Sequence, residues 1–229
     1  MNAVNEESLF RAAVLPDDLC SQTNESGVSI DYVLSPTFVQ PADYQWFVLR
    51  VPYGREREVA ATIQSPTLLT YAPALTVARI RNGKRIMEEK SALPNMFFAY
   101  AREEQLAYYQ DRPIPLKDQP HRQPGQLRFM YDHTRKNDAG YDCKMTVPFE
   151  QMCHFIRVTM QHDEHVRVYL NDAFSAQLGD YVEVIEGKFA GVRGRVARLH
   201  GQTCVLVSLE GICIASTAYV PKAFLKKVF

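Results

Sequence analysis

The pattern of hydrophobic and polar positions divides the chain into a long mixed region and a shorter region made only of strands. Residues 46–51 form an apolar run rich in aromatic and β-branched side chains, which is typical of a buried strand. The segment REREVAATIQ then places its apolar residues on one helical face and its charges on the other. It stops before Ser65-Pro66, so a helix is predicted to end there.

A β-hairpin is predicted next, because 76–81 alternates, 84–88 returns, and Asn82-Gly83 between them tolerates the positive φ values of a type I′ turn. The other elements predicted in this region are a core strand over 96–100, a short helix over 103–110, a proline-rich loop over 111–126, a strand over 127–131, a polar turn over 134–140 and a helix from Pro148. A single sheet with helices packed on it, an α+β fold, accounts for this order.

The pattern changes near residue 171. The strands predicted beyond it are 181–185, 194–199, 203–209 and 212–215, separated by glycine-containing turns. Short strands over about fifty residues favour a small β-barrel. The chain is therefore divided into a flexible leader over 1–43, an α+β domain over 44–171 and a barrel domain over 172–229.

Charge separates the leader from the rest. The chain of 229 residues has 26 basic and 26 acidic residues, but residues 1–43 hold one basic residue against seven acidic ones. A net charge of zero neither requires nor excludes nucleic acid, which usually calls for a strongly basic patch. No apolar run approaches the ~18 residues of a membrane span. We expect a cytoplasmic protein with no membrane contact.

Catalytic and metal chemistry find little support in the sequence. The five cysteines are odd in number and form no Cys-x-x-Cys pair, so reduced thiols are expected. Neither Cys143 nor Ser208 lies in a nucleophile elbow, and no glycine-rich phosphate loop is present. His162 and His165 form only one close pair, whereas zinc sites usually combine two. No catalytic residue, metal or cofactor is predicted.

The sharpest motif lies in the barrel region and reads G-D-x-V-x-V-x-x-G-x-F-x-G-x-x-G-x-V. Its residues are Gly179, Asp180, Val182, Val184, Gly187, Phe189, Gly191, Gly194 and Val196. Alternating valines fill a barrel, and glycines allow tight turns where a Cβ would clash. The motif resembles the KOW motif of NusG-type transcription factors and of several ribosomal proteins, which implies a small SH3-like barrel.

The first domain resembles the same family. W-F-V-L-R-V-P-Y-G-R-E is similar to the opening strand and helix of the NusG N-terminal domain, and Y-A-P-A-L-T-V-A-R-I-R-N-G-K-R is closer to the specialised paralogue RfaH. An RfaH-like first domain with an intact KOW barrel also resembles the UpxY-type antiterminators of capsular polysaccharide operons. The two resemblances together cover residues 44–229.

The resemblance implies a protein that holds RNA polymerase. In the family, the first domain grips the clamp helices of the large subunit through an exposed hydrophobic pocket, and the barrel recruits a second partner such as Rho or a ribosomal protein. The matching pocket positions are Tyr53, Leu93, Pro94, Met96 and Phe98. The matching positions near upstream or non-template DNA are Arg79, Arg81, Lys84 and Arg85. The alternative for these four is an edge hairpin kept soluble by its charges.

Three departures limit what the resemblance carries over. Leu93-Pro94-Asn95-Met96 stands where the family often has Phe-Pro-x-Tyr. Residues 107–109 do not match the polar contact of RfaH with the polymerase gate loop. Glu210 replaces the aromatic residue of the tetrad that touches Rho in NusG, so Rho binding is not expected.

The resulting prediction is a non-enzymatic elongation and antitermination factor that suppresses pausing or termination, at specific operons such as those for polysaccharide synthesis. One alternative is a general, housekeeping NusG. Another is a ribosome-associated KOW RNA-binding protein, which would favour a strongly basic barrel, whereas residues 172–229 hold seven basic and five acidic residues.

Overall fold

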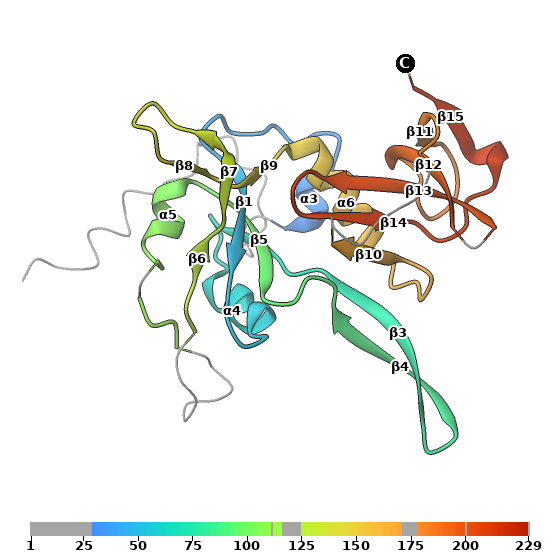
Figure 1. The fold of residues 1–229 in the computed structure, drawn as a ribbon, viewed down its shortest axis with the longest axis horizontal. Helices are drawn as coiled ribbons and strands as arrows, with labels where there is room; N and C mark the ends of the chain where they lie inside the picture. The colour runs from blue at the N-terminus through green and yellow to red at the C-terminus, as the bar shows by residue number, and fades with distance from the viewer. Residues whose placement is uncertain (1–28, 111, 116–124, 171–177, 200, 229) are drawn as a thin grey trace, which may run out of the picture.

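The computed structural model describes residues 29–110, 112–115, 125–170, 178–199 and 201–228. Its first region is built on an antiparallel sheet in the order β2-β5-β1-β6, with β9 pairing β1 next to β6 (Figure 1). The strands are β1 (Gln45–Arg50), β2 (Leu69–Tyr71), β5 (Met96–Ala101), β6 (Arg128–Phe129) and β9 (Thr146–Val147). The predicted core strands over 46–51 and 96–100 are confirmed and lie side by side.

Helices cover both faces of this sheet. They are α4 (Glu56–Ile63), α5 (Glu103–Ala107) and α6 (Phe149–Thr159). Because side chains alternate along a strand, Trp46 and Val48 of β1 enter the core that α6 covers. Phe47 and Leu49 enter the opposite core, which α4 and α5 cover. The α+β sheet-with-helices architecture predicted for this region is confirmed.

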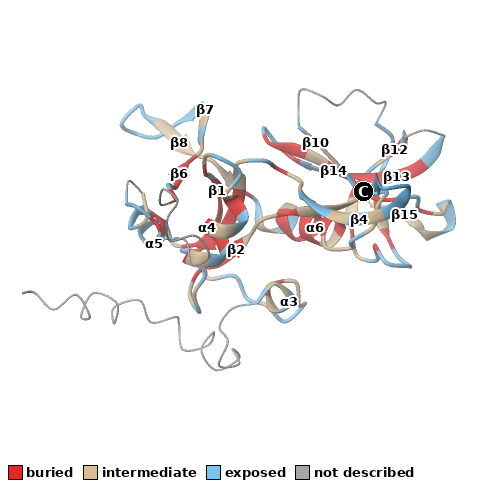
Figure 2. Ribbon diagram, turned by 90° about the horizontal axis from the view of Figure 1, so that it is seen from below, coloured by how far each residue is buried: buried red, intermediate tan, exposed pale blue. Residues whose placement is uncertain are grey.

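Helix α6 is buried on nearly all sides. Its apolar spacing predicted a helix from Pro148, which is the N-cap residue, and seven of its 11 residues are buried. One side of α6 packs on the first sheet, where the rings of Phe155 and Phe98 lie 5.6 Å apart. The other side packs on strands of the second region, chiefly β13. In Figure 2 the buried residues concentrate in the first sheet, in α6 and in the second region. No helix in the described ranges is long and apolar enough to cross a membrane.

Two β-ribbons leave the first region as separate two-stranded sheets. They are β3 (Ala74–Arg81) with β4 (Lys84–Ser91), and β7 (Tyr131–Lys136) with β8 (Asp142–Lys144). The first is the predicted hairpin, with Asn82 and Gly83 at φ values of 52° and 73°, and it projects away from the sheet (Figure 1). The second corrects the predicted polar turn over 134–140, because Thr134 to Lys136 continue a strand and only 137–140 turn.

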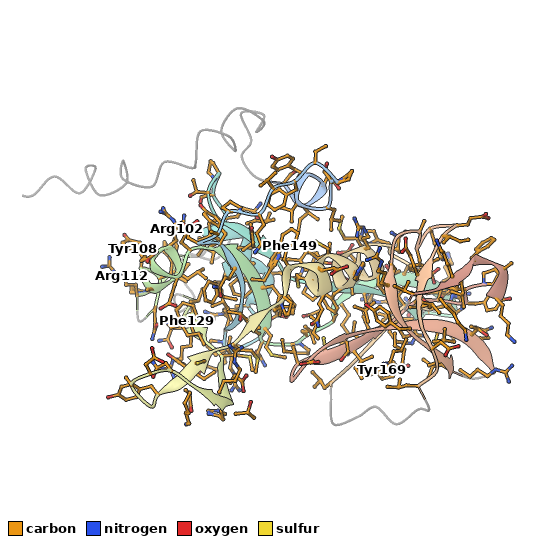
Figure 3. The ribbon with its side chains drawn as sticks, turned by 90° about the horizontal axis from the view of Figure 1, so that it is seen from above. Arg102, Tyr108, Arg112, Phe129, Phe149 and Tyr169 are labelled. Carbon is orange, nitrogen blue, oxygen red and sulfur yellow. The ribbon has the colours of Figure 1, made fainter. Side chains whose placement is uncertain are left out.

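The segment before β1 packs against the first domain. Helix α3 (Ile30–Val33) buries Val33, and the carbonyl of Leu34 accepts a hydrogen bond from Arg157 Nη2 at 2.9 Å. The Phe38 ring stacks on Phe149 at 5.3 Å, and Figure 3 shows Phe149 at the start of α6. The prediction of a flexible leader is therefore wrong for residues 29–43, because apolar side chains hidden among polar neighbours pack on α6. Residues 1–28 lie outside the described ranges.

The second region is one antiparallel sheet in the order β10-β14-β13-β12-β11-β15. Its strands are β10 (Arg167–Leu170), β11 (Tyr181–Val184), β12 (Arg193–Leu199), β13 (Gln202–Leu209), β14 (Cys213–Ser216) and β15 (Leu225–Lys227), and the 3₁₀ turn η2 (Lys222–Phe224) precedes the last strand. Four of the six match the predicted barrel strands, and the SH3-like class is confirmed. Strand β10 precedes the boundary predicted at 171 and 172, yet it pairs with β14. The boundary itself stays a prediction.

Candidate functional site

Two loops meet at one end of the first sheet and are held together by Asn95. The backbone N–H of Gly54 donates to Asn95 Oδ1 at 2.8 Å, and the N–H of Val51 donates to the Asn95 carbonyl at 2.9 Å. The N–H of Asn95 in turn donates to Glu56 Oε2 at 3.2 Å. These bonds fix the loop after β1 against the turn before β5.

Tyr53 is the most conspicuous side chain of these loops. Its backbone has a φ of 66°, in the left-handed region that disfavours bulky residues and costs roughly 1–2 kcal/mol. Its side chain is nevertheless 79% exposed, with the Arg55 guanidinium 5.9 Å from the ring centre. The backbone strain at Tyr53 is not offset by burial of its side chain. Residues held in such strained backbone conformations cluster at functional sites.

The five residues predicted to form an exposed pocket do not share one surface. Tyr53 and Pro94 are exposed, and Met96 is half-buried. Leu93 and Phe98 are fully buried in the core that α6 covers. The expectation of an exposed pocket is wrong for these two, because β5 directs Phe98 towards Phe155 and the packing of α6 closes that face.

The four predicted nucleic-acid contacts lie on two faces of the β3–β4 ribbon. Arg79 is opposite Ile86 and Arg81 is opposite Lys84, while Arg85 is opposite Ile80. Residues that face each other across an antiparallel pair point to the same side, and the side alternates along the strand. Arg79, Arg81 and Lys84 therefore share one face, and Arg85 lies on the other with Ile80.

Some of the basic side chains on the ribbon have an ion-pair partner and others do not. Arg79 Nη1 lies 3.3 Å from Glu88 Oε2. Arg85 pairs with Glu164 in the loop after α6, and that hydrogen bond holds the pKa of Glu164 below its usual range. Arg81 and Lys84 form no ion pair within the part of the chain that the structure describes. The ribbon thus presents two adjacent unneutralised cations at its tip.

The KOW-like motif residues build the second sheet. Val182, Val184 and Phe189 are buried in its core. Asp180 Oδ2 lies 2.7 Å from Lys227 Nζ, which links β11 to β15. Gly187 and Gly191 adopt φ values of 83° and 80° in the loop between β11 and β12.

Gly194 has the strictest requirement of the motif. A Cβ on this residue would lie 2.1 Å from the carbonyl oxygen of Leu206 on the neighbouring strand. Val196 and Gly179 lie close by, since the Gly179 N–H donates to the Val196 carbonyl at 2.8 Å. The close approach of β12 and β13 explains why the sequence places glycine there.

The turn that aligns with the partner-binding tetrad of the family lies against the first domain. Leu209 and Ile212 are buried, and a Cβ on Gly211 would meet Met145 Cε at 3.6 Å. Glu210 is exposed and lines a cleft of about 310 Å³ between α6 and the second sheet, together with Gln151. The turn is thus partly covered in this arrangement.

Sequence reasoning missed the residues that join the two regions. Arg193 Nη1 lies 3.1 Å from Glu150 Oε1 of α6, and its Nε lies 2.9 Å from Glu183 Oε2 of β11. The bonds to Glu183 raise the pKa of Arg193. Lys188 pairs with Asp163 in the loop after α6. No local pattern signals the Arg193–Glu150 and Lys188–Asp163 pairs, because each joins segments distant in the sequence, whereas Arg193 and Glu183 face each other on neighbouring strands.

The cysteines with raised pKa values are buried, and His162 and His165 lie next to carboxylates. Burial raises the pKa of Cys153 to about 11 and that of Cys213 to about 12, so both stay protonated at neutral pH. His162 Nδ1 lies 3.6 Å from Glu89, whereas His165 Nδ1 lies 3.1 Å from Asp163. The described residues contain no group of three or more side chains placed to hold a metal ion.

Comparison with known proteins places the first domain in a family. Residues 44–138 match the family model described as transcription termination factor nusG. The match begins just before β1, includes the β3–β4 ribbon and ends in the turn after β7. Comparison with curated proteins gives no match. Residues 44–138 are therefore similar to the NusG family, whose members are non-enzymatic transcription elongation and antitermination factors that bind RNA polymerase.

Proposed function

We propose that this protein binds the clamp region of RNA polymerase through Tyr53, Pro94 and Met96, and that it suppresses pausing or termination. The observation that carries the proposal is the pairing of strain and exposure at Tyr53. Asn95 holds the Tyr53 loop and the turn containing Pro94 in a fixed relation, so their apolar side chains form a pre-organised surface.

The β3–β4 ribbon supplies the second contact, to upstream or non-template DNA. Arg81 and Lys84 are the cations available for phosphate, with Arg79 on the same face. Phosphate contacts are largely blind to sequence, so the ribbon strengthens engagement without selecting a site. Arg85 plays no part in this contact as long as it is paired with Glu164.

An operon-specific role of the UpxY type is part of the same proposal. The support comes from the RfaH-like residues around the ribbon and from Glu210, which stands where a Rho-binding factor has an aromatic residue. The barrel then serves a partner other than Rho, such as a ribosomal protein. The domains would be 44–171 and 172–229, with β10 joined to the second sheet across the boundary.

Replacing Tyr53 by glycine tests the polymerase surface, because we expect it to lower the affinity for polymerase without lowering the stability of the protein. Truncating a central apolar anchor weakens binding by about 2 kcal/mol, or roughly thirtyfold. Glycine also relieves the left-handed backbone at φ 66°, so the free energy of unfolding should hold or rise by up to ~1 kcal/mol. Affinity for core RNA polymerase and denaturant unfolding are measured on the same preparation.

Tyr141→Gly is the matched control. Tyr141 is 73% exposed but has no positive φ, so its replacement should leave binding unchanged and give no gain in stability. Met96→Asp is a second variant aimed at the same surface. Wild-type affinity in both Tyr53→Gly and Met96→Asp would show that the polymerase surface lies elsewhere.

A further inference from the structure

A histidine occupies the junction between α6 and the second sheet. His154 is 6% exposed, and its Nδ1 accepts a hydrogen bond from the backbone N–H of Arg193 on β12 at 3.4 Å. A ring nitrogen can accept only when it carries no proton. This contact between the two regions therefore requires neutral imidazole, with its proton on Nε2.

The surroundings of His154 oppose a positive charge. Burial is the main cause that lowers its pKa; Arg157 of α6 and Arg193 of β12 lower it further, whereas Glu150 of α6 raises it. Glu183 of β11 also faces this region, but it is bonded to Arg193. Nε2 is buried without a hydrogen-bond partner among the described residues and lies 3.7 Å from Glu150 Oε1.

The junction around His154 is incompletely packed. His154 and Arg193 both line two clefts, one of about 310 Å³ and one of about 400 Å³. Two ion pairs also cross the junction within the described residues, Arg193 with the exposed Glu150 and Lys188 with the largely buried Asp163. The exposed Arg193–Glu150 pair contributes little to stability, so the state of the His154 contact, whose imidazole is buried, affects how firmly the sheet is held.

We propose that His154 is a proton-sensitive latch, which holds the second sheet against α6 while it is neutral and releases the sheet when it gains a proton. Protonation places an N–H on Nδ1 directly against the Arg193 N–H, which converts a donor and acceptor into two donors. It also adds a buried charge beside two arginines. Release uncovers α6 and the turn that contains Glu210.

The direction of the pH dependence follows from the lowered pKa of His154 in the closed form. In the open form the ring is exposed and has the ordinary pKa of about 6.5. The closed form is therefore fully favoured above that pH and loses stability as the pH falls below it. Between the two pKa values, the ratio of open to closed molecules rises by up to about tenfold per pH unit.

The test measures opening and titration on the full chain. Small-angle X-ray scattering from pH 8 to pH 5 reports the radius of gyration, and NMR follows the histidine ring signals over the same range. The His154 signal is identified by its absence in His154→Gln. Near-UV circular dichroism checks that both cores stay folded throughout. Wild type should expand along the titration curve of His154.

Two variants separate the latch from general effects of acid. His154→Gln keeps an acceptor for the Arg193 N–H but cannot be protonated, so its radius should not change with pH. His133→Gln removes an exposed histidine of the β7–β8 ribbon and should expand like wild type. The latch is overturned if wild type stays compact, if its expansion does not follow the His154 signal, or if His154→Gln expands equally.

Discussion

The two β-ribbons differ in the charges that face each other next to their turns. Next to the turn of β3–β4, Arg81 stands directly opposite Lys84, and like charges in that position destabilise a strand pair. Next to the turn of β7–β8, Lys136 stands opposite Asp142, which also lies 2.6 Å from His133 Nδ1. One ribbon therefore neutralises its own tip, and the other keeps two cations close together.

This difference supports the β3–β4 ribbon as the one that we propose to contact a polyanion. The β3–β4 ladder is regular over eight residues in each strand, and Arg57 of α4 anchors it through Glu89 at 2.9 Å. The β7–β8 ladder is irregular between Asp132 and Lys136. A stiff ribbon that accepts repulsion at its tip suits an external anion, whereas the β7–β8 ribbon satisfies its charges internally.

Reversing the tip charges should give the largest effect. Arg81→Glu with Lys84→Glu should remove most of the read-through in a purified elongation assay while binding to core polymerase is retained. The loss should shrink between about 50 and 200 mM salt, because counterions already weaken the wild-type contact. Arg128→Glu with Arg135→Glu, at and beside the other ribbon, is the control and should change little. Equal losses of read-through in both double variants would show that the β3–β4 ribbon has no special role in this contact.

Lys84→Glu alone should sharpen the comparison through stability. It converts the repulsive pair into an attractive one, so hydrogen exchange of the β3–β4 amides should slow by roughly two- to fivefold. Asp142→Lys creates the repulsive pair in the other ribbon and should speed exchange there. Faster exchange in Lys84→Glu would show that the facing cations Arg81 and Lys84 do not destabilise the ribbon.

Acid should produce the smallest effect, which we expect at Asp142 of the β7–β8 ribbon. Hydrogen bonds from Lys136 and His133 hold the pKa of Asp142 below 3.8. The contribution of Asp142 is therefore present above pH 3.8 and is lost as the pH falls through its lower, folded-state pKa. Amide shifts of residues 137–141 should titrate in that range and should stop doing so in Asp142→Asn. Persistence of the titration in that variant would assign it to another group, such as Asp132.

Elements with strong local signals could be predicted from the sequence. The β1 strand, α4 and the β3–β4 hairpin follow from an apolar run, a helical face and the Asn82-Gly83 pair. The β7 strand was missed because most of its side chains are exposed, so it shows no alternation of apolar and polar residues. The α3 segment was missed because Val33 and Phe38 stand among polar residues, and only their packing on α6 reveals them as core.

The candidate site was predicted less completely, for a different reason. Family resemblance selected Leu93 and Phe98 for an exposed pocket, but their exposure depends on where α6 packs. The strain at Tyr53 lies in its backbone φ of 66°, which no residue type in the sequence predicts. The contact of His154 with Arg193 exists only when two distant segments meet.

The burial of α6 on both sides also bears on the order in which the protein is made. The ribosome finishes α6 before it adds β13, which supplies much of the cover for the outer side of the helix. Domains generally fold as they emerge, so a nascent chain passes through a stage in which that apolar side faces solvent. Holdase chaperones recognise such surfaces, and they should bind more strongly to nascent chains that expose α6 but lack β13 than to the finished chain.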